Sequence, residues 1–167
     1  MCMINLNMNA VFCDVIAKQD GSSISLGDIV SKKYYISTED STRKISQFSL
    51  AVFITATQAK EHKEVDPDQV FSFDQKYEVR VRLTETYSGE FKDLTSFIID
   101  PSVSCDSEGL CRNVFQYTRI CMFSNNVELP EKREKERFVI KLVIRRRDSN
   151  CENWTVQSIF PIRFENN

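Results

Sequence analysis

Histidine is nearly absent from the chain, and this scarcity excludes most of the usual catalytic and metal sites. His62 is the single histidine among 167 residues. A zinc site of the usual ligand spacing therefore cannot be assembled from neighbouring residues. A Cys–His pair or a Ser-His-Asp triad would have to use His62, whose neighbours in segment 60–64 are all charged, as on a solvated surface. We expect no enzyme, no cofactor and no metal ion.

Glycine and long apolar runs are also scarce. The four glycines are scattered, so they form no phosphate-binding glycine loop, and the nucleophile-elbow sequence Gly-x-Ser-x-Gly does not occur. No apolar run approaches the roughly 20 residues that span a bilayer. Segment 1–10 is neither charged enough nor apolar enough for a secretory signal. These absences predict a soluble, cytoplasmic protein.

Neither sign of charge dominates the chain. The formal net charge is −2, so the molecule lacks the strong basic field that gathers nucleic acid or anionic lipid. We therefore expect no DNA, RNA or membrane partner. Acidic residues gather in segment 64–68 and at Asp100, Asp106 and Glu108. They do not match the EF-hand pattern and are interpreted as solubilising loop residues, with calcium binding left open.

Cysteine, in contrast, is well represented, with six residues in the chain. No CxxC pair is present, and Cys13 and Cys121 lie among apolar residues of apparent strands, where a thiol behaves as a small hydrophobic group. The prediction is reduced, structural thiols. Cys105 and Cys111 bound a short segment that could close on itself, and this disulfide is left open. The remaining cysteines are Cys2 and Cys151.

The dominant positive signal is the alternation of apolar and polar residues that marks half-buried strands. Apolar residues alternate with Glu78, Arg80, Arg82 and Thr84 in segment 77–84, and the pattern recurs in segments 113–123, 138–145 and 154–164. Segment 48–57 is apolar on both faces, as in a strand near the middle of a fold. The chain is also rich in aromatic residues, which favour strands.

These patterns predict one all-β domain over residues 1–167, a two-layer antiparallel β-sandwich of the immunoglobulin/C2-like kind with about eight or nine strands. Segments 138–147 and 154–164 should form a terminal hairpin. Trp154 is expected to anchor the core, because it begins a strand whose alternate residues are mostly apolar.

The layout resembles that of small uncharacterised bacterial β-sandwich domains, which open with a strand ending in a Phe-Cys-Asp-like triplet. Here the triplet is Phe12-Cys13-Asp14. The resemblance implies a β-sandwich and carries no functional residue.

The chain is predicted to be a non-enzymatic interaction module that recognises a protein partner through loops or a sheet face. Segments 100–112 and 125–137 exceed the length of tight hairpin turns, and loops on a rigid scaffold often carry function. The first of these segments is favoured. Its predicted contact residues are Asp106, Glu108, Leu110 and Arg112.

The alternative is a sensor or sequestering protein for a small anionic, phosphate-bearing ligand. Guanidinium and ammonium groups bind phosphate, and the candidate residues are Arg80, Arg82, Lys141 and Arg145. Tyr34, Tyr35 and Phe91 are considered as stacking groups beside them. The competing interpretation is a charged sheet face that prevents edge aggregation.

Overall fold

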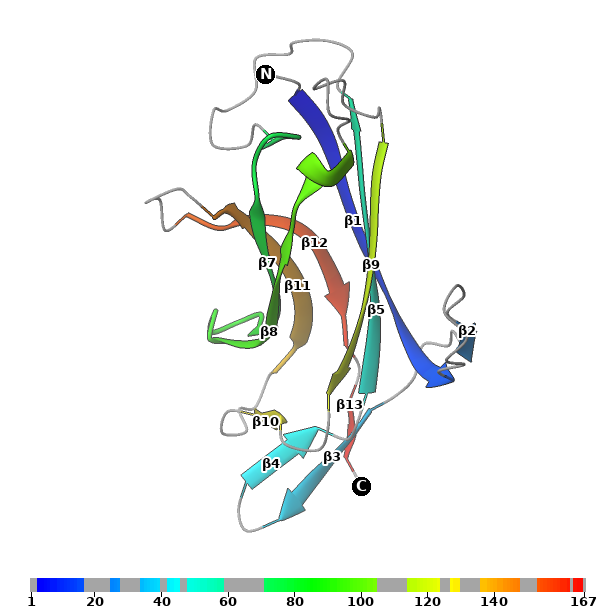
Figure 1. Cartoon of the computed structure of the whole chain (residues 1–167). Helices are drawn as coiled ribbons and strands as arrows, with labels where there is room; N and C mark the ends of the chain where they lie inside the picture. Colours follow the sequence, from blue (N-terminus) through cyan, green and yellow to red (C-terminus); the bar gives the residue numbers. More distant parts are fainter. Residues whose placement is uncertain are drawn as a thin grey trace.

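The computed structural model describes part of the chain, namely residues 3–16, 25–27, 34–39, 42–45, 48–58, 71–104, 114–123, 127–129, 136–147, 153–162 and 164–166. Within this part the structure is β-strand throughout, apart from turns and the short 3-10 helix η2 (Pro101–Ser104) (Figure 1). The predicted all-β class with antiparallel sheets is confirmed. The immunoglobulin/C2-like sandwich pattern stays a prediction.

The first sheet is built around the strand that is apolar on both faces. Its path is β2-β1-β5-β9, with β6 pairing to β1, and every pair is antiparallel. The strands are β1 (Met3–Ile16), β2 (Ser25–Gly27), β5 (Phe48–Gln58), β6 (Phe71–Ser72) and β9 (Val114–Phe123). The central position of β5 explains why its first five residues are all buried.

The second sheet has the order β12-β11-β7-β8 and is also antiparallel. Its strands are β7 (Tyr77–Glu85), β8 (Phe91–Ile99), β11 (Phe138–Arg146) and β12 (Thr155–Pro161). The sheet curls visibly in Figure 1. Two register shifts, at Val81/Arg82 and at Leu142/Val143, interrupt its ladders, and such bulges bend and twist strands. The pairing of β11 with β12 confirms the predicted terminal hairpin.

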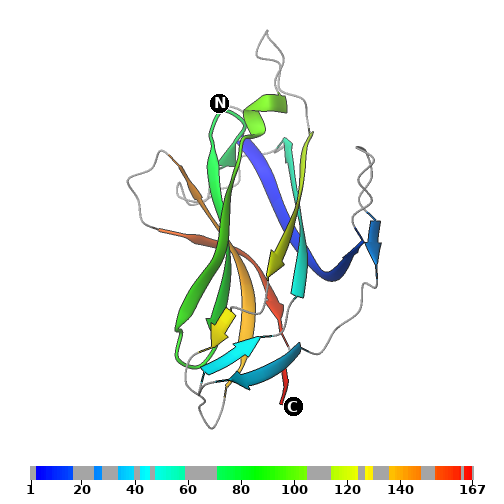
Figure 2. The same ribbon diagram turned by 60° about the horizontal axis from the view of Figure 1, so that its bottom comes forward.

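A third, small sheet lies at the end of the molecule near the carboxyl terminus (Figure 2). It consists of β10 (Val127–Leu129), β4 (Thr42–Ile45), β3 (Tyr34–Glu39) and β13 (Phe164–Asn166), in that order, and its β13–β3 pair is parallel. The mostly buried side chain of Arg43 pairs with both carboxylate oxygens of Glu136. This pair ties β4 to the segment that leads into β11.

One hydrophobic core contains the apolar faces of the two large sheets. Alternate residues of β7 and β11 are buried, as their sequence patterns predict, and they share a cluster with Leu50, Val52 and Ile54 of β5. The two sheets also meet at their edges. The Ser158 hydroxyl of β12 donates to the Met8 carbonyl of β1, and Phe97 of β8 stacks on Tyr117 of β9 at 5.7 Å between ring centroids.

The turn between β7 and β8 is held by a buried carboxylate. Glu85 accepts hydrogen bonds from the backbone N–H groups of Tyr87, Ser88 and Arg137. Gly89 in the same turn has a φ of 73°, a left-handed conformation that glycine adopts without strain. This anchoring places Phe91, at the start of β8, beside the outer face of the sheet, where the candidate site lies.

Candidate functional site

The outer face of the second sheet, which points away from the hydrophobic core, carries a line of charged side chains. Successive residues of a strand point to opposite faces, so the buried residues of β7 leave Glu78, Arg80 and Arg82 outside. The register places Arg82 opposite Lys141 and Glu78 opposite Arg145. The four residues predicted for anion binding, Arg80, Arg82, Lys141 and Arg145, therefore share one face of two adjacent strands.

Trp154 lies on this same outer face, and its predicted place in the core is wrong. The ring is half-buried, and its centroid lies 4.3 Å from the guanidinium carbon of Arg80, 4.6 Å from that of Arg145 and 5.7 Å from that of Arg82. The aromatic ring and the cations attract one another. Trp154 is thus the centre of an arginine–tryptophan cluster, defined as Trp154 with Arg80, Arg82 and Arg145.

The physical reason for this correction is a bulge in β12. Leu142 pairs with Ser158, whereas the next residue, Val143, pairs with Val156. Gln157 is therefore an extra residue that reverses the alternation of the strand. Phe160 beyond the bulge packs against the core, while Val156 before it is 47% exposed. The sequence pattern, taken as uninterrupted, instead predicts that Trp154, Val156 and Phe160 lie on one buried face.

Two carboxylates hold the three guanidinium groups in place. Glu78 binds Arg80 at 2.9 Å and Arg145 at 2.8 Å. Asp93 of β8 binds Arg80 at 2.9 Å and Arg82 at 2.6 Å. The guanidinium carbon of Arg82 also lies 3.9 Å from the ring centroid of Phe91. Phe91, one of the residues considered for stacking, therefore belongs to this face. The roles of Trp154 and Asp93 were missed, because the first depends on the bulge and the second on the register between β7 and β8.

The ionisation of the two carboxylates reflects this network. Partial burial raises the pKa of Glu78, but hydrogen bonds from Arg145 and Arg80 outweigh it and hold the pKa below its usual value. The pKa of Asp93 is likewise lowered, because Arg82 and Arg80 outweigh its partial burial. Burial opposes the charge of Arg80, yet Glu78 and Asp93 raise its pKa. The network therefore remains fully charged at neutral pH.

A groove of about 300 Å³ runs beside the cluster. Its apolar lining includes Val139, Val143, Val156 and Ile159, and its other walls are Thr84, Arg82, Lys141, Phe91 and Trp154, with Thr86 and Gly89 at the turn. Three of these apolar side chains are well exposed, Phe91 at 59%, Ile159 at 56% and Val156 at 47%. The face thus combines exposed apolar area with fixed aromatic and cationic groups.

Thr84 adds an unusual polar group to the groove. It is 4% exposed, and its hydroxyl oxygen is buried without a hydrogen-bond partner among the described residues. Most buried polar groups find a partner, and an exception calls for an explanation. A molecule bound in the groove would supply one.

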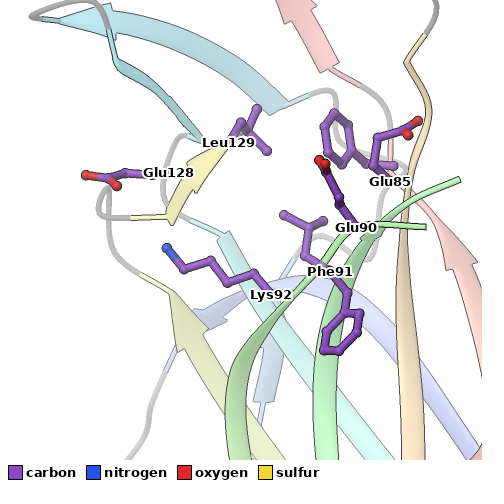
Figure 3. A pocket seen from close by; sticks show the side chains of 8 residues that line it. Glu85, Glu90, Phe91, Lys92, Glu128 and Leu129 are labelled. Carbon is purple, nitrogen blue, oxygen red and sulfur yellow. The ribbon is translucent and has the colours of Figure 1, made fainter. Parts of the chain in front are cut away.

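A second hollow, of about 260 Å³, lies between the β7–β8 turn and β10 (Figure 3). Leu83, Leu129 and Phe138 of the core line it, together with the charged residues Glu90, Glu128 and Lys92. The carboxylate of Glu85, on the far side from Lys92 in Figure 3, is already bonded to three backbone N–H groups. This hollow is thus an end of the core lined by charges of both signs.

The other predicted site residues fall outside the described part of the chain. These are the favoured partner-binding residues Asp106, Glu108, Leu110 and Arg112, together with His62, Cys105 and Cys111. Cys13 and Cys121 are buried free thiols. Burial raises the pKa of each, which suppresses the reactive thiolate form.

The described residues contain no group of three or more His, Cys, Asp or Glu side chains placed to hold a metal ion. They also contain no helix that is long and apolar enough to cross a membrane. Comparisons with protein-family models, with curated proteins and with solved structures find no match.

Proposed function

We propose that the chain is a non-enzymatic interaction module of the cytoplasm, a β-sandwich that binds a protein partner through the outer face of the sheet β12-β11-β7-β8. The observation that carries the proposal is the groove itself, in which apolar residues of β11 and β12 lie beside Trp154, Phe91 and Arg82. Exposed apolar patches of this kind mark interaction sites. Segments 100–112 and 125–137 stay predicted contributors.

The residue types of the face favour a protein as the partner. Tryptophan and arginine are the residues most enriched among those that dominate binding energy at protein interfaces, and they act best in a packed, preorganised setting. Arg80, Arg82 and Arg145 are held on the ring of Trp154 and by two carboxylates. Little side-chain entropy is then left to lose on binding.

The alternative, a small phosphate-bearing ligand, is supported by the presence of Arg82 and Lys141 in one groove. The ion pairs of the arginines weigh against it. A phosphate that bound all three guanidinium groups would have to displace Glu78 and Asp93. The groove volume of about 300 Å³ is also at the lower end of small-molecule pockets.

The test is affinity capture from the native host with three baits, the wild-type chain, Ile159→Asp and Met122→Asp. Ile159 lines the groove, whereas Met122 is a comparably exposed apolar residue, at 68%, on β9 of the other sheet. Both variants should keep the thermal midpoint of the wild type. We expect the wild type and Met122→Asp to retain the same partner and Ile159→Asp to lose it.

Equal retention by all three baits would refute the proposed face and return attention to the loops. If no protein is retained, while inorganic phosphate or a nucleoside phosphate binds the wild type and not Lys141→Glu, the small-ligand alternative takes its place.

A further inference from the structure

We propose that the groove receives an acidic segment of the partner protein, in which a carboxylate is bound between Lys141 and Thr84 while a neighbouring aliphatic side chain rests on Val156 and Ile159. This inference rests on the proposed function and specifies the chemistry of the partner. Three observations support it: the positive charge of the face, two polar groups of the groove that have no partner among the described residues, and the arginine side chains that cover the aromatic rings.

The charge of the face is opposite to that of the whole chain. Arg80, Arg82, Arg145 and Lys141 carry positive charge there, while Glu78 and Asp93 carry the negative charge of its ion-pair network. The face therefore has an excess of positive charge on a chain whose formal net charge is −2. Such local complementarity directs an acidic partner to this face and disfavours basic ones.

Two polar groups of the groove lack a partner in the described part of the chain. Lys141 makes no ion pair with any described residue, in contrast to the three arginines. The buried hydroxyl of Thr84 has no hydrogen-bond partner there. A carboxylate accepts hydrogen bonds through both of its oxygens, so one such group can satisfy an ammonium donor and a hydroxyl donor together.

The strand register brings these two groups near each other and beside the apolar floor. Lys141 pairs with Arg82 on one side and with Ile159 on the other. Thr84 lies two residues beyond Arg82 on β7, so it points to the same face, and both it and Lys141 line the groove. Diagonal neighbours of this kind are about 7–8 Å apart, a separation that a carboxylate can bridge between a hydroxyl and a long lysine side chain.

The aromatic rings of the face are placed to hold arginines, which argues against a single-stranded nucleic acid. Such partners stack their bases on exposed aromatic rings. Here Arg80 and Arg145 lie on Trp154, and Arg82 lies on Phe91. A base would have to displace a guanidinium group that is also held by a carboxylate.

The experiment uses the single tryptophan of the chain, Trp154, as a fluorescent reporter in the groove. The full-length protein is titrated with a peptide that alternates Glu with Leu, with matched Gln–Leu and Lys–Leu peptides, with a single-stranded oligonucleotide and with inorganic phosphate. We expect the acidic peptide to bind at least about tenfold more tightly than the neutral one, and the Lys–Leu peptide, the oligonucleotide and phosphate to bind more weakly than the acidic one.

Two variants test the assigned contacts. Lys141→Glu should weaken binding of the acidic peptide at least about tenfold, whereas Lys92→Glu, the same change on β8 outside the groove, should leave it unchanged. Thr84→Val should also weaken binding, yet it should keep or raise thermal stability, because it removes a buried hydroxyl that has no hydrogen-bond partner in the part of the chain that the structure describes. A merely structural role for Thr84 would lower stability and leave peptide affinity unaltered.

The inference is overturned if the acidic peptide binds no more tightly than the neutral one, including the case in which neither binds. It is also overturned if Lys141→Glu and Lys92→Glu behave alike, or if the oligonucleotide or phosphate binds more tightly than the acidic peptide. If capture of the partner depends on Ile159 but is unchanged by Lys141→Glu, this inference is contradicted and the proposed function stands. If Ile159→Asp retains the partner as well as the wild type does, both this inference and the proposed function are contradicted.

Discussion

At the scale of single residues, Trp154 shows how a side chain on a sheet face can be fixed without entering the core. Its ring is half-buried and lies against Arg80 and Arg145 at 4.3 and 4.6 Å from their guanidinium carbons. Cation–π contacts contribute about 0.5–2 kcal/mol. Trp154→Leu should therefore lower the free energy of unfolding in urea by about 1–2 kcal/mol. A loss of about 3–5 kcal/mol, typical of a fully buried aromatic ring, would instead return Trp154 to the core.

Glu85 provides a second prediction at this scale, on acid stability. Burial opposes its ionisation, but the N–H groups of Ser88, Tyr87 and Arg137 outweigh burial and lower its pKa from 4.5 to about 2. A lowered carboxyl pKa stabilises the fold above the unfolded pKa, and this stability is lost as pH falls through the folded value. The advantage of the wild type over Glu85→Gln should thus shrink as pH falls from 4.5 to about 2.

The measurement is the thermal midpoint of both proteins across this pH range. Glu128→Gln, the same charge change on an exposed side chain, is the control and should follow the wild type. A constant difference between the wild type and Glu85→Gln at every pH would show that the carboxylate is not what the turn depends on.

At the scale of elements, the bulge in β12 decides which side chains form the groove. Gln157 is the extra residue between the Val143–Val156 and Leu142–Ser158 pairs. Its deletion should shift the strand by one residue and turn Trp154 and Val156 toward the core. The closely packed core cannot accept an indole ring without strain, so the deletion should lower the urea midpoint. Gln157→Ala keeps the bulge and should change stability by no more than about 0.5 kcal/mol.

The measurements are the urea unfolding midpoint and the emission maximum of Trp154, compared between the Gln157 deletion and Gln157→Ala. Equal midpoints and equal emission would mean that the bulge does not control the orientation of the tryptophan. The rest of the hairpin depends less on this detail, because β11 keeps an unbroken register with β7 and buries Phe138, Ile140, Leu142 and Ile144.

At the scale of the whole molecule, the two described thiols test whether the first sheet opens as one unit. Cys13 of β1 and Cys121 of β9 are both buried, and they lie on opposite faces of the sheet, because Cys13 pairs with Ser49 and Cys121 with the adjacent Leu50. Alkylation in increasing urea, followed by mass spectrometry, should label both together at the global transition. Labelling of Cys121 well before Cys13 would reveal separate opening of β9.

Much of the fold could be predicted from local pattern, and less of the candidate site. The alternation in segment 77–84 predicted the buried and outward faces of β7, and the doubly apolar segment 48–57 predicted the central place of β5. The positions of Arg80, Arg82, Lys141 and Arg145 on strand faces followed from the same period. Their alignment across β7 and β11 could not, because register depends on pairing between segments far apart in the chain.

The sequence by itself determined the all-β class and the outward side of Glu78, Arg80 and Arg82, because the two-residue period of a strand is a local property that each segment carries alone. The tertiary structure alone decided that Trp154 points outward, since one extra residue in β12 reverses a face only relative to its partner strand. It alone brought Asp93 to Arg82 and placed the hydroxyl of Thr84, which has no hydrogen-bond partner among the described residues, in one groove with Lys141. These are relations between strands, and they exist only once the strands are paired.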